Sequence, residues 1–252
     1  MDVIVVDTPA GTDVSQRPRS AELHPGPGFR VRAGGDAPDR AVIDGLGGFA
    51  TPDISDLLNR LYAVDAEIRS LTEPGTSICA VACTVKVFPG DNLMVHKSLD
   101  IARPGEVVVV DAAASRRNAV LGDLICAKAK HRGIAAFIVD GLVRDLPAVR
   151  EIGLPVFARG TTPVGPLHRG PGEINYPVVC GGVVTNPGDI VVADEAGMVV
   201  VPYGIAADLL ARLRADRERL EQYTADVRRG EFDNVWVDRL LGEHGCPTEP
   251  AG

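Results

Sequence analysis

The hydrophobic and polar positions in the middle of the chain alternate in blocks that predict a strand, a helix and a second strand. Residues 106–111 form a short β-branched run after a Pro-Gly turn, which is typical of a buried strand. Residues 123–132 are rich in helix formers, and Gly133 follows where a helix should end. Residues 134–139 are again continuously apolar and are followed by Asp140-Gly141. This order predicts a β-α-β unit with parallel strands and a right-handed crossover.

Further strands and helices are predicted on both sides of this unit. Thr51 followed by Pro52 and Asp53 is a favourable helix start, and apolar residues recur behind it at helical spacing. Strand-like runs lie at residues 77–87, 152–157, 176–185 and 198–201, and residues 93–99 fit either a short strand or a helix. From residue 205 onward the pattern is helical, with an apolar stripe formed by Leu209, Leu210, Leu213 and Leu220. The mixture of elements predicts an α/β fold.

The same pattern predicts one folded domain between two less regular ends. Residues 1–41 are rich in proline, glycine, arginine and aspartate, so we expect an irregular extension that is draped over the body or a neighbouring subunit, or is disordered. Residues 42–241 carry the periodic elements and are expected to form a single domain. Residues 242–252 contain two prolines and are expected to form a flexible tail.

Composition narrows the class of protein. The chain has 252 residues, of which 45% are hydrophobic, which is enough for one sizeable core. Its formal charge of −8 argues against a general nucleic-acid surface, and no apolar run approaches the roughly 20 residues that a membrane helix needs. The first residues lack the basic start of a secretory signal, and the five cysteines, an odd number without CxxC spacing, fit reduced thiols. We therefore expect a cytoplasmic protein that binds neither nucleic acid nor membrane.

A group of charged residues is expected where the second strand of the β-α-β unit ends. Twenty residues lie between Asp123, which opens the predicted helix, and Arg144. This interval has the length of one helix and one strand, so Arg144 and Asp145 should return beside Asp123. Ligands of open α/β sheets usually bind at this edge.

These residue types are suited to binding a metal ion and a 2-oxo acid. Asp145 could ligate a hard divalent cation directly, while Asp123 could hold its waters or accept a proton. Arg144 presents a planar fork for a carboxylate or enolate oxygen. The free amides of Leu124 and Ile125, in the first turn of the helix, form a second anion site. Such a site would stabilise negative charge on a keto oxygen and favour cleavage between C3 and C4.

Each of these residues also fits a purely structural role. Asp145 after Arg144 could form a surface ion pair or a turn, and Asp123 alone is a favourable acid for a helix start. His96 could be a core or a surface histidine, and Asn92 fits an Asx-type turn.

Several motifs in combination resemble a known family. They are Gly122-Asp123 with the twenty-residue interval, Asp140-Gly141-Leu142-Val143-Arg144-Asp145, Gly153-Leu154-Pro155-Val156-Phe157-Ala158-Arg159-Gly160, Pro89-Gly90-Asp91-Asn92-Leu93 with His96, and Pro187-Gly188-Asp189-Ile190-Val191-Val192-Ala193-Asp194. Over roughly residues 45–225 the chain is similar to the RraA-like family. That family includes the 4-hydroxy-4-methyl-2-oxoglutarate / 4-carboxy-4-hydroxy-2-oxoadipate aldolases.

The resemblance implies a fold, an activity and an assembly. The implied fold is a layered α/β/β body that resembles swivelling domains, with a central mixed sheet and a C-terminal helix. The implied activity is that of a class II pyruvate aldolase dependent on Mg²⁺ or Mn²⁺, which often also decarboxylates oxaloacetate. The implied assembly is a homotrimer or homohexamer with sites at subunit interfaces.

The resemblance also implies roles for individual residues. Asp145 would ligate the metal, Asp123 would organise metal-bound water, and Arg144 would contact the pyruvoyl oxygen. The start of the helix would hold the substrate carboxylate, through Gly122, Leu124 and Ile125.

Other positions would contact the rest of the substrate or complete a neighbouring site. Asn92 and His96 fall where the family contacts the rest of the substrate. A carboxylate of the C-terminal helix, Glu218 or Glu221, is a candidate for completing a neighbour's site. The chain departs from the family pattern in residues 161–173, which include His168, and in the long N-terminal extension, so substrate identity stays open.

Two alternatives to the aldolase remain. The family's namesake is a non-catalytic regulator that binds an RNA-processing nuclease. The presence of Asp145 favours an enzyme, because a purely regulatory member should lose this acid. An aldolase-like enzyme repurposed for a biosynthetic substrate, with a pocket reshaped by the N-terminal extension, is the second alternative.

Overall fold

A ten-stranded mixed sheet forms the centre of the protein. The structure is a computed structural model that describes residues 18–73 and 75–247. The sheet has the order β1-β8-β3-β4-β6-β7-β2, with β5 beside β6 and with β11 and β12 extending from β3. The strands of this sheet are β1 Phe29–Val31, β2 Arg69–Ser70, β3 Ile78–Val87, β4 Val107–Asp111, β5 Ala119–Leu121, β6 Ala136–Val143, β7 Val156–Thr161, β8 Gly172–Ile174, β11 Ile190–Asp194 and β12 Gly197–Val201. A separate hairpin consists of β9 Val178–Cys180 and β10 Val183–Thr185.

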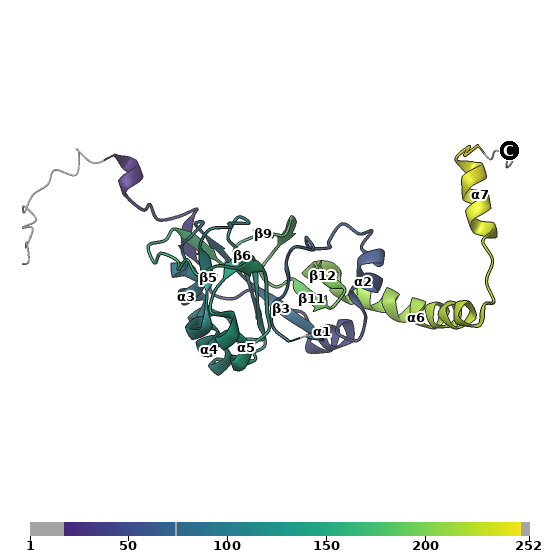
Figure 1. The fold of residues 1–252 in the computed structure, drawn as a ribbon, viewed down its shortest axis with the longest axis horizontal. Helices are drawn as coiled ribbons and strands as arrows, with labels where there is room; N and C mark the ends of the chain where they lie inside the picture. Colours follow the sequence, from purple (N-terminus) through teal and green to yellow (C-terminus); the bar gives the residue numbers. More distant parts are fainter. Residues whose placement is uncertain (1–17, 74, 248–252) are drawn as a thin grey trace, which may run out of the picture.

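Helices and a second β layer cover the two faces of the sheet (Figure 1). The helices are α1 Arg40–Leu46, α2 Thr51–Leu57, α3 Leu93–Ile101, α4 Asp123–His131, α5 Leu146–Ile152, α6 Ala206–Arg229 and α7 Val235–Glu243, with short 3₁₀ turns η2 Arg19–Ala21 and η3 Tyr203–Ile205. Residues of α3, α4 and α5 share a core cluster with one face of the sheet. Residues of β9, β10, β11 and β12 share another cluster with the opposite face. The expected layered α/β/β fold is therefore confirmed.

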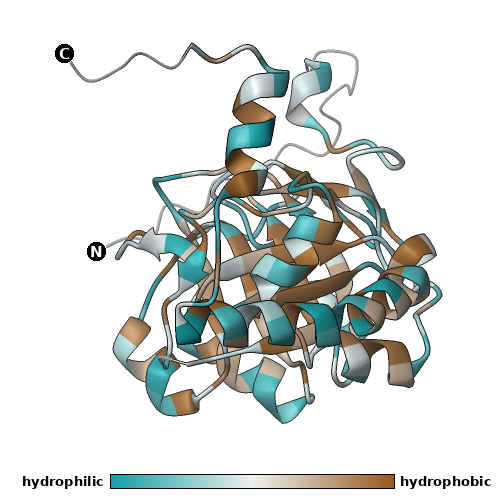
Figure 2. Ribbon diagram, turned by 90° about the vertical axis from the view of Figure 1, so that its right-hand side faces the viewer, coloured by the Kyte–Doolittle hydropathy of each residue, from teal (hydrophilic) through white to brown (hydrophobic). Residues whose placement is uncertain are grey.

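Strand β4 shows why the central run of the sequence is continuously hydrophobic. Val108 and Val110 belong to the cluster under the helices, whereas Val107 and Val109 belong to the cluster under the second β layer. Successive side chains of a strand point to opposite faces, so a strand covered on both sides needs apolar residues at every position. Figure 2 shows the same arrangement, with hydrophobic strands enclosed and the outward faces of the helices hydrophilic.

The predicted β-α-β unit is present, with two differences. Strands β4 and β6 are parallel, and α4 lies between them in the sequence. A short strand, β5, precedes the helix and also pairs in parallel with β6. The second predicted strand does not end at residue 139, because β6 continues through Asp140-Gly141 to Val143. Glycine suits position 141 in the interior of this strand because there is little space for a side chain. A Cβ atom on residue 141 would lie only 3.0 Å from Cβ of Ala112.

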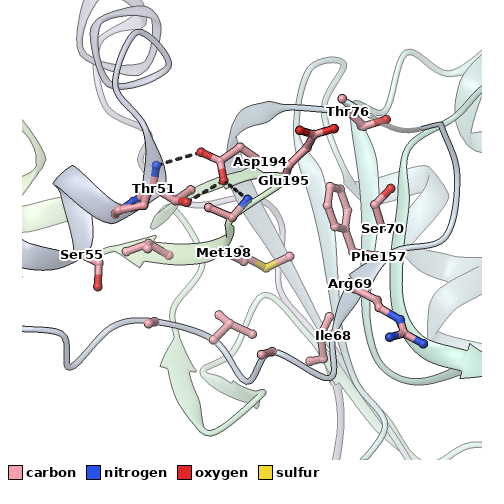
Figure 3. A pocket seen from close by; sticks show the side chains of 18 of the residues that line it. Thr51, Ser55, Ile68, Arg69, Ser70, Thr76, Phe157, Asp194, Glu195 and Met198 are labelled. Atoms are coloured by element: carbon pink, nitrogen blue, oxygen red, sulfur yellow. Dashed lines mark hydrogen bonds between the residues drawn. The ribbon is translucent and has the colours of Figure 1, made fainter. Parts of the chain in front are cut away.

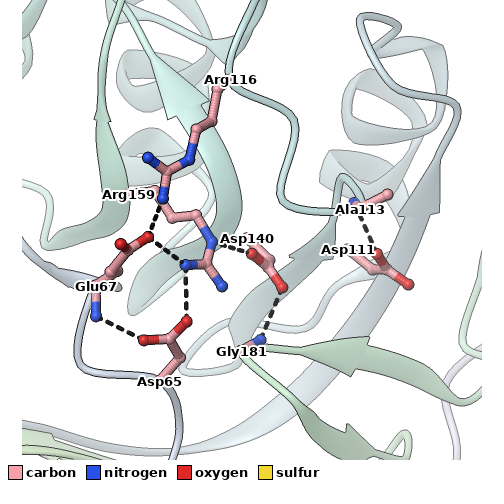
Figure 4. Close-up of polar contacts among 8 residues, drawn as sticks. All are labelled: Asp65, Glu67, Asp111, Ala113, Arg116, Asp140, Arg159 and Gly181. Atoms are coloured by element: carbon pink, nitrogen blue, oxygen red, sulfur yellow. Dashed lines mark hydrogen bonds and ion pairs between the residues drawn. The ribbon is translucent and has the colours of Figure 1, made fainter.

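Asp140 is a buried member of an ion-pair network centred on Arg159 rather than a turn residue (Figure 4). Asp140 is 5% exposed, and its carboxylate binds Nε of Arg159 and accepts the N–H of Gly181 at 2.8 Å. Nη1 of Arg159 lies 2.8 Å from Asp65 and 2.9 Å from Glu67. Burial lowers the pKa of Arg159, but its hydrogen bonds to the carboxylates outweigh burial and raise the pKa above its ordinary value. The network joins β6, β7, the β9–β10 hairpin and the segment before β2.

The structure decides one open alternative and corrects two other predicted elements. Residues 93–99, for which the sequence allowed a strand or a helix, lie in helix α3. The strand expected at residues 152–157 begins only at Val156, because α5 occupies residues 146–152. Residues 176–185 form the two short strands β9 and β10 rather than one.

The N-terminal extension is not wholly irregular, which corrects the expectation for residues 1–41. Strand β1 pairs in parallel with β8, and Arg30 forms an ion pair with Glu173 at 2.6 Å. Helix α1 begins at Arg40, before the predicted start of the domain. Residues 1–17 lie outside the described residues.

The C-terminal helices form an arm that leaves the body (Figure 1). Leu209, Leu210 and Leu213 of α6 are buried, but Leu220, which we expected in the same stripe, is 46% exposed. Helix α7 has no buried residue and ends at Glu243, inside the predicted tail, whose residues 248–252 lie outside the described residues. Within the described parts of the chain, none of the helices combines the length and the apolar character needed to cross a bilayer.

Candidate active site

A small pocket of about 190 Å³ lies where α3 and α4 begin, under the loop that follows β7. The residues that line it are Asn92, His96, Leu121, Gly122, Asp123, Leu124, Ile125, Arg144, Pro166 and His168. Seven of these residues were predicted from the sequence as site residues. Asp145, the predicted metal ligand, lies beside the pocket rather than in its lining.

The ends of β5 and β6 bring the two charged segments together. Leu121 of β5 is in register with Val143 of β6, and the N–H of Arg144 donates to the carbonyl of Leu121 at 3.0 Å. Gly122 follows Leu121, and helix α4 begins at Asp123. Gly122-Asp123 and Arg144-Asp145 therefore leave the same edge of the sheet side by side.

Gly122 is the point at which the two segments touch. A Cβ atom on this residue would lie 2.5 Å from Oδ2 of Asp145 and 3.0 Å from Cγ of Arg144. Its backbone is extended, with φ of −148°, so glycine is needed here for space rather than for an unusual dihedral angle. The absence of a side chain lets the Asp145 carboxylate and the Arg144 side chain lie directly over the start of α4.

Asp145 adopts a left-handed backbone conformation, with φ of 56° and ψ of 33°. Aspartate tolerates this region better than most residues, but it still costs about 1–3 kcal/mol, and such strain is concentrated at functional sites. The residue precedes α5 without forming a side-chain cap. Its Oδ2 instead lies 3.1 Å from Nε of Arg144. The carboxylate of Asp145 therefore lies at the edge of the pocket, and its other oxygen, Oδ1, takes no part in this ion pair.

Arg144 is held between two glycines. In addition to its contact with Gly122, its Nη1 would lie 2.7 Å from a Cβ atom on Gly165. The side chain is 40% exposed, so the guanidinium lines the pocket and remains accessible to a ligand. Gly165 belongs to the loop after β7 and was not identified from the sequence.

The anion site at the start of α4 is partly occupied by the protein itself. Oδ1 of Asp123 accepts the N–H of Leu124 at 2.7 Å. The resemblance assigns this amide, together with that of Ile125, to the substrate carboxylate. A substrate that binds there would replace the Asp123 contact at Leu124, which would free the Asp123 carboxylate for another partner.

The pocket lining also contains an amide and two histidines. Asn92 is 2% exposed, and its Nδ2 donates to the carbonyl of Val120 at 2.9 Å. Its Oδ1 lies 2.6 Å from Nδ1 of His168. The rings of His96 and His168 meet edge to face, with their centroids 5.5 Å apart. Burial, followed by the charges of His168 and Lys128, lowers the pKa of His96, which favours its neutral form.

The loop that carries His168 is fastened over the pocket by backbone hydrogen bonds. The N–H of Leu167 donates to the carbonyl of Gly90 at 2.7 Å, and the N–H of Asn92 donates to the carbonyl of Leu167 at 2.9 Å. Oδ2 of Asp91 accepts the N–H of Arg169 at 2.5 Å. The sequence marked this segment as unusual for the family, but it did not place His168 in the pocket.

The available donor atoms fit a hard divalent cation better than zinc. Asp145 and Asp123 offer carboxylate oxygens, which suit a cation that keeps several waters, such as Mg²⁺ or Mn²⁺. Among residues 18–73 and 75–247 there is no cluster of three or more histidine, cysteine, aspartate or glutamate side chains that could enclose a metal. Cys126 of α4 is buried in the core, and burial raises the pKa of its thiol to about 12.

A larger cleft of about 610 Å³ lies on another part of the molecule (Figure 3). Ile68, Phe157 and Met198 contribute apolar surface to it. The carboxylate of Asp194 accepts the N–H of Thr51 at 2.9 Å and its hydroxyl at 2.6 Å, which anchors the start of α2. Because this acid is committed to helix α2, we place the candidate active site at the smaller pocket, where a guanidinium and carboxylates converge on a helix start.

Comparison with known proteins identifies the family. The family model described as RraA-like, Aldolase/RraA, matches residues 51–200. The chain belongs to the RraA-like family. The matched residues of this RraA-like protein include every residue of the candidate site, whereas β1 and the C-terminal arm lie outside them. The family expected from the motifs is therefore confirmed.

Relatives of this RraA-like protein carry two kinds of name. It is 40% identical over 179 residues to a protein of Halalkalibacterium halodurans named "Putative 4-hydroxy-4-methyl-2-oxoglutarate aldolase", a match that covers 70% of this chain and 85% of that protein. Streptomyces coelicolor RraAS2, described as an unusual member of the RNase ES inhibitor RraA family, superimposes with a TM-score of 0.67 and 31% identity over 75% of this chain and 98% of that one. An uncharacterized protein from Pseudomonas syringae pv. tomato has a TM-score of 0.67 and 27% identity over 81% of this chain and 99% of that one.

Proposed function

We propose that this RraA-like protein is a divalent-metal-dependent pyruvate aldolase, which cleaves a 4-hydroxy-2-oxo acid to pyruvate and a second carbonyl compound. The observation that carries this proposal is the position of Asp145 and Arg144 directly over Gly122, at the start of α4. The names of the curated relatives support the same reaction class. The substrate class suggested by those names is 4-hydroxy-4-methyl-2-oxoglutarate and similar acids.

The pocket residues can stabilise the charge that this reaction develops. Arg144 would donate hydrogen bonds to the 2-oxo oxygen as it gains negative charge, and the amides at the start of α4 would hold the carboxylate. A cation bound by Asp145, with waters ordered by Asp123, would polarise the 2-oxo group as a Lewis acid. As the C3–C4 bond breaks, its electron pair enters the enolate of pyruvate and the C4 hydroxyl loses its proton. Asp123 is suited to accept that proton, directly or through a water molecule.

The same arrangement would also support loss of CO₂ from oxaloacetate. Decarboxylation of this acid produces the same pyruvate enolate, so it needs the same stabilisation by Arg144. We therefore include oxaloacetate decarboxylation in the proposed activity.

Removal of divalent cations tests the proposed function. Pyruvate release from 4-hydroxy-4-methyl-2-oxoglutarate, followed with lactate dehydrogenase and NADH, should stop when EDTA is added and resume with excess Mg²⁺ or Mn²⁺. The reason is that Arg144 alone supplies only part of the charge stabilisation that the enolate requires. Pyruvate release that continues at the same rate in EDTA would contradict the metal-dependent reaction.

A non-catalytic regulator is the second candidate function. It is favoured by the name of the structural relative RraAS2, which is described within a family of RNase ES inhibitors. A protein of this kind would bind a ribonuclease and release no pyruvate from any member of a panel of 4-hydroxy-2-oxo acids. The same panel would reveal an aldolase-like enzyme with a biosynthetic substrate, because another acid would then be preferred.

The assembly and the C-terminal helix are part of the proposed function. Glu218 and Glu221 are exposed on the part of α6 that follows Leu213, and Glu221 lines a groove between α6 and α2. We expect a homotrimer or homohexamer in which one of these carboxylates would reach a neighbouring site.

Replacement of Gly122 by alanine is expected to lower pyruvate release about 100-fold, because displacing a catalytic group by about 1 Å can have this effect. The new methyl group would occupy the space of the Asp145 carboxylate and push it from the start of α4. The measurement is the steady-state rate together with a circular dichroism spectrum that shows an unchanged fold. Gly204→Ala is the matched control, because a Cβ atom there has no neighbour within 4 Å. Equal activity of the two variants would contradict the assigned contact.

A further inference from the structure

The two segments in which the sequence departs from the family pattern lie against each other in the structure. One contains the loop between β7 and β8, residues 162–171, which brings His168 to the pocket. The other is the N-terminal extension, whose strand β1 pairs in parallel with β8 directly after this loop. The family model matches only from residue 51 onward, so the strand beside β8 comes from a part of the chain that the model does not include.

Apolar side chains of the N-terminal extension enclose the end of the loop at Gly170. A Cβ atom on Gly170 would lie 3.3 Å from Cε2 of Phe29 and 3.5 Å from Cδ1 of Leu23. It would also lie 3.5 Å from Cδ2 of Leu93, which follows Asn92 of the pocket and opens α3. Phe29 is partly buried and packs against the core cluster under the helices. The end of the loop therefore contacts both the N-terminal extension and the start of α3.

A buried carboxylate, that of Glu173, fastens β1 to β8. Its Oε1 accepts the N–H of Gly28 at 2.9 Å and lies 2.6 Å from Nε of Arg30. Glu173 is 9% exposed, and burial raises the pKa of its carboxyl group. The hydrogen bonds from Gly28 and Arg30, with a smaller contribution from the charge of Lys86, outweigh burial and hold this pKa below its ordinary value. The charged form of Glu173 is thus stabilised largely by the N-terminal extension.

Backbone pairing and aromatic stacking extend this attachment. The N–H of Gly172, the first residue after the loop, donates to the carbonyl of Gly28 at 2.8 Å. The Cζ atoms of Arg30 and Arg32 lie 3.7 Å and 4.3 Å from the ring centroid of Tyr176, within the range of cation–π attraction. Strand β8 pairs with β3 on its other edge, so β1 covers the edge that β3 leaves open.

The attachment lies close enough to the pocket to affect its lining. Only Arg169 separates His168 from Gly170 in the sequence. Pro166 and His168 line the pocket, and Nδ1 of His168 lies 2.6 Å from Oδ1 of Asn92. A ligand can use the complete pocket only in molecules whose loop is in place, so a loss of loop order lowers the apparent affinity by the fraction of such molecules.

We infer that Phe29 and Arg30 are positioning residues of the candidate active site. They hold β8 and the end of the loop, so that Pro166 and His168 stay in the pocket lining. The N-terminal extension is then a working part of the site, although it contributes no side chain to the pocket. The expected effect on catalysis rests on the proposed aldolase function, whereas the order of the loop does not.

Hydrogen–deuterium exchange measures the order of the loop without turnover. In Arg30→Met, the backbone amides of residues 162–171 should exchange about tenfold faster than in the wild-type protein, because β8 loses a hydrogen bond to a charged group. Peptides from α4 should exchange at the wild-type rate. Arg30→Lys keeps a cation beside Glu173 and should restore most of the protection.

Arg40→Met is the matched control for the exchange measurement. It removes an arginine whose ion pair with Asp44, at 2.8 Å, lies within the exposed surface of α1. Exchange of the loop should stay at the wild-type rate in this variant. Unchanged loop exchange in Arg30→Met, or equally faster exchange in Arg40→Met, would overturn the positioning role.

Kinetics test the effect of the loop on the pocket. Phe29→Ala/Arg30→Met removes both side-chain contacts of β1, so KM for 4-hydroxy-4-methyl-2-oxoglutarate should rise about tenfold while kcat changes less than about twofold. Val42→Ala/Arg40→Met is the matched control, because it removes a partly buried apolar side chain and an ion-paired arginine that pack elsewhere, on α1. Its KM should equal that of the wild-type protein, and circular dichroism should show that both variants are folded.

The outcomes distinguish the positioning role from the proposed function. If the wild-type protein releases no pyruvate, the aldolase proposal fails, and hydrogen–deuterium exchange still decides whether β1 holds the loop. If pyruvate is released and the folded Phe29→Ala/Arg30→Met variant keeps the wild-type KM, the aldolase proposal stands and the positioning role is wrong.

Discussion

Replacing Asp145 with asparagine is expected to lower pyruvate release by about 1,000-fold, with the fold intact. Loss of the carboxylate removes the proposed direct metal ligand, and Lewis-acid stabilisation of several kcal/mol corresponds to about three orders of magnitude in rate. Asparagine is preferable to alanine in this experiment because it also tolerates the left-handed backbone at this position. The change therefore tests the charge rather than the turn. The measurement is kcat/KM at saturating Mg²⁺ and again at tenfold higher Mg²⁺.

Asp56→Asn is the matched control for this variant. Asp56 is an exposed aspartate that also pairs with an arginine, Arg60, at 3.1 Å, the distance found between Arg144 and Asp145. Its replacement should leave activity unchanged. If Asp145→Asn retains the wild-type rate, the ion pair with Arg144 is only a surface contact, and the lyase proposal loses its main support.

Replacing Arg159 with methionine is expected to lower the free energy of unfolding by about 3 kcal/mol, within the range for breaking a buried ion pair. The Arg159 side chain is 8% exposed, and its removal would leave the carboxylate of Asp140 buried with no cation beside it. Methionine has a similar length, so the change mainly removes charge and hydrogen bonds. Urea denaturation followed by circular dichroism provides the measurement.

Two further variants identify the cause of this destabilisation. Arg116→Met removes a neighbouring cation whose side chain is 68% exposed and pairs with Glu67, so it should change stability by less than about 1 kcal/mol. Combining Arg159→Met with Asp140→Asn should recover part of the loss, because asparagine is uncharged and still accepts the N–H of Gly181. A double variant less stable than Arg159→Met would show that the buried charge is not the cause.

The central part of the fold could be predicted because its signals are local. The valine run of β4, the helix formers of α4 and the glycine after it are all visible within short segments. The twenty residues between Asp123 and Arg144 have the combined length of a helix and a strand. This length was sufficient to predict that Gly122-Asp123 lies beside Arg144-Asp145.

The predictions from the sequence were wrong or incomplete where residues far away in the chain determine the local structure. Asp140-Gly141 has the composition of a turn, but Arg159 neutralises the aspartate and the N–H of Gly181 donates to it, which allows β6 to continue. Strand β1 was missed because its partner, β8, is more than 140 residues away in the sequence. His168 could not be placed because its position depends on hydrogen bonds between its loop and the segment that contains Gly90 and Asn92.

The two segments that carry Arg144 and His168 differ in how freely they can change during evolution. Arg144 and Asp145 extend directly from a buried strand that also carries the Asp140 network, so most alterations there would endanger folding as well as chemistry. His168, in contrast, lies on an exposed loop that is tied down mainly through main-chain atoms, which almost any sequence provides. New substrates should therefore be acquired by exchanging side chains on this loop, while the bond that is broken stays the same.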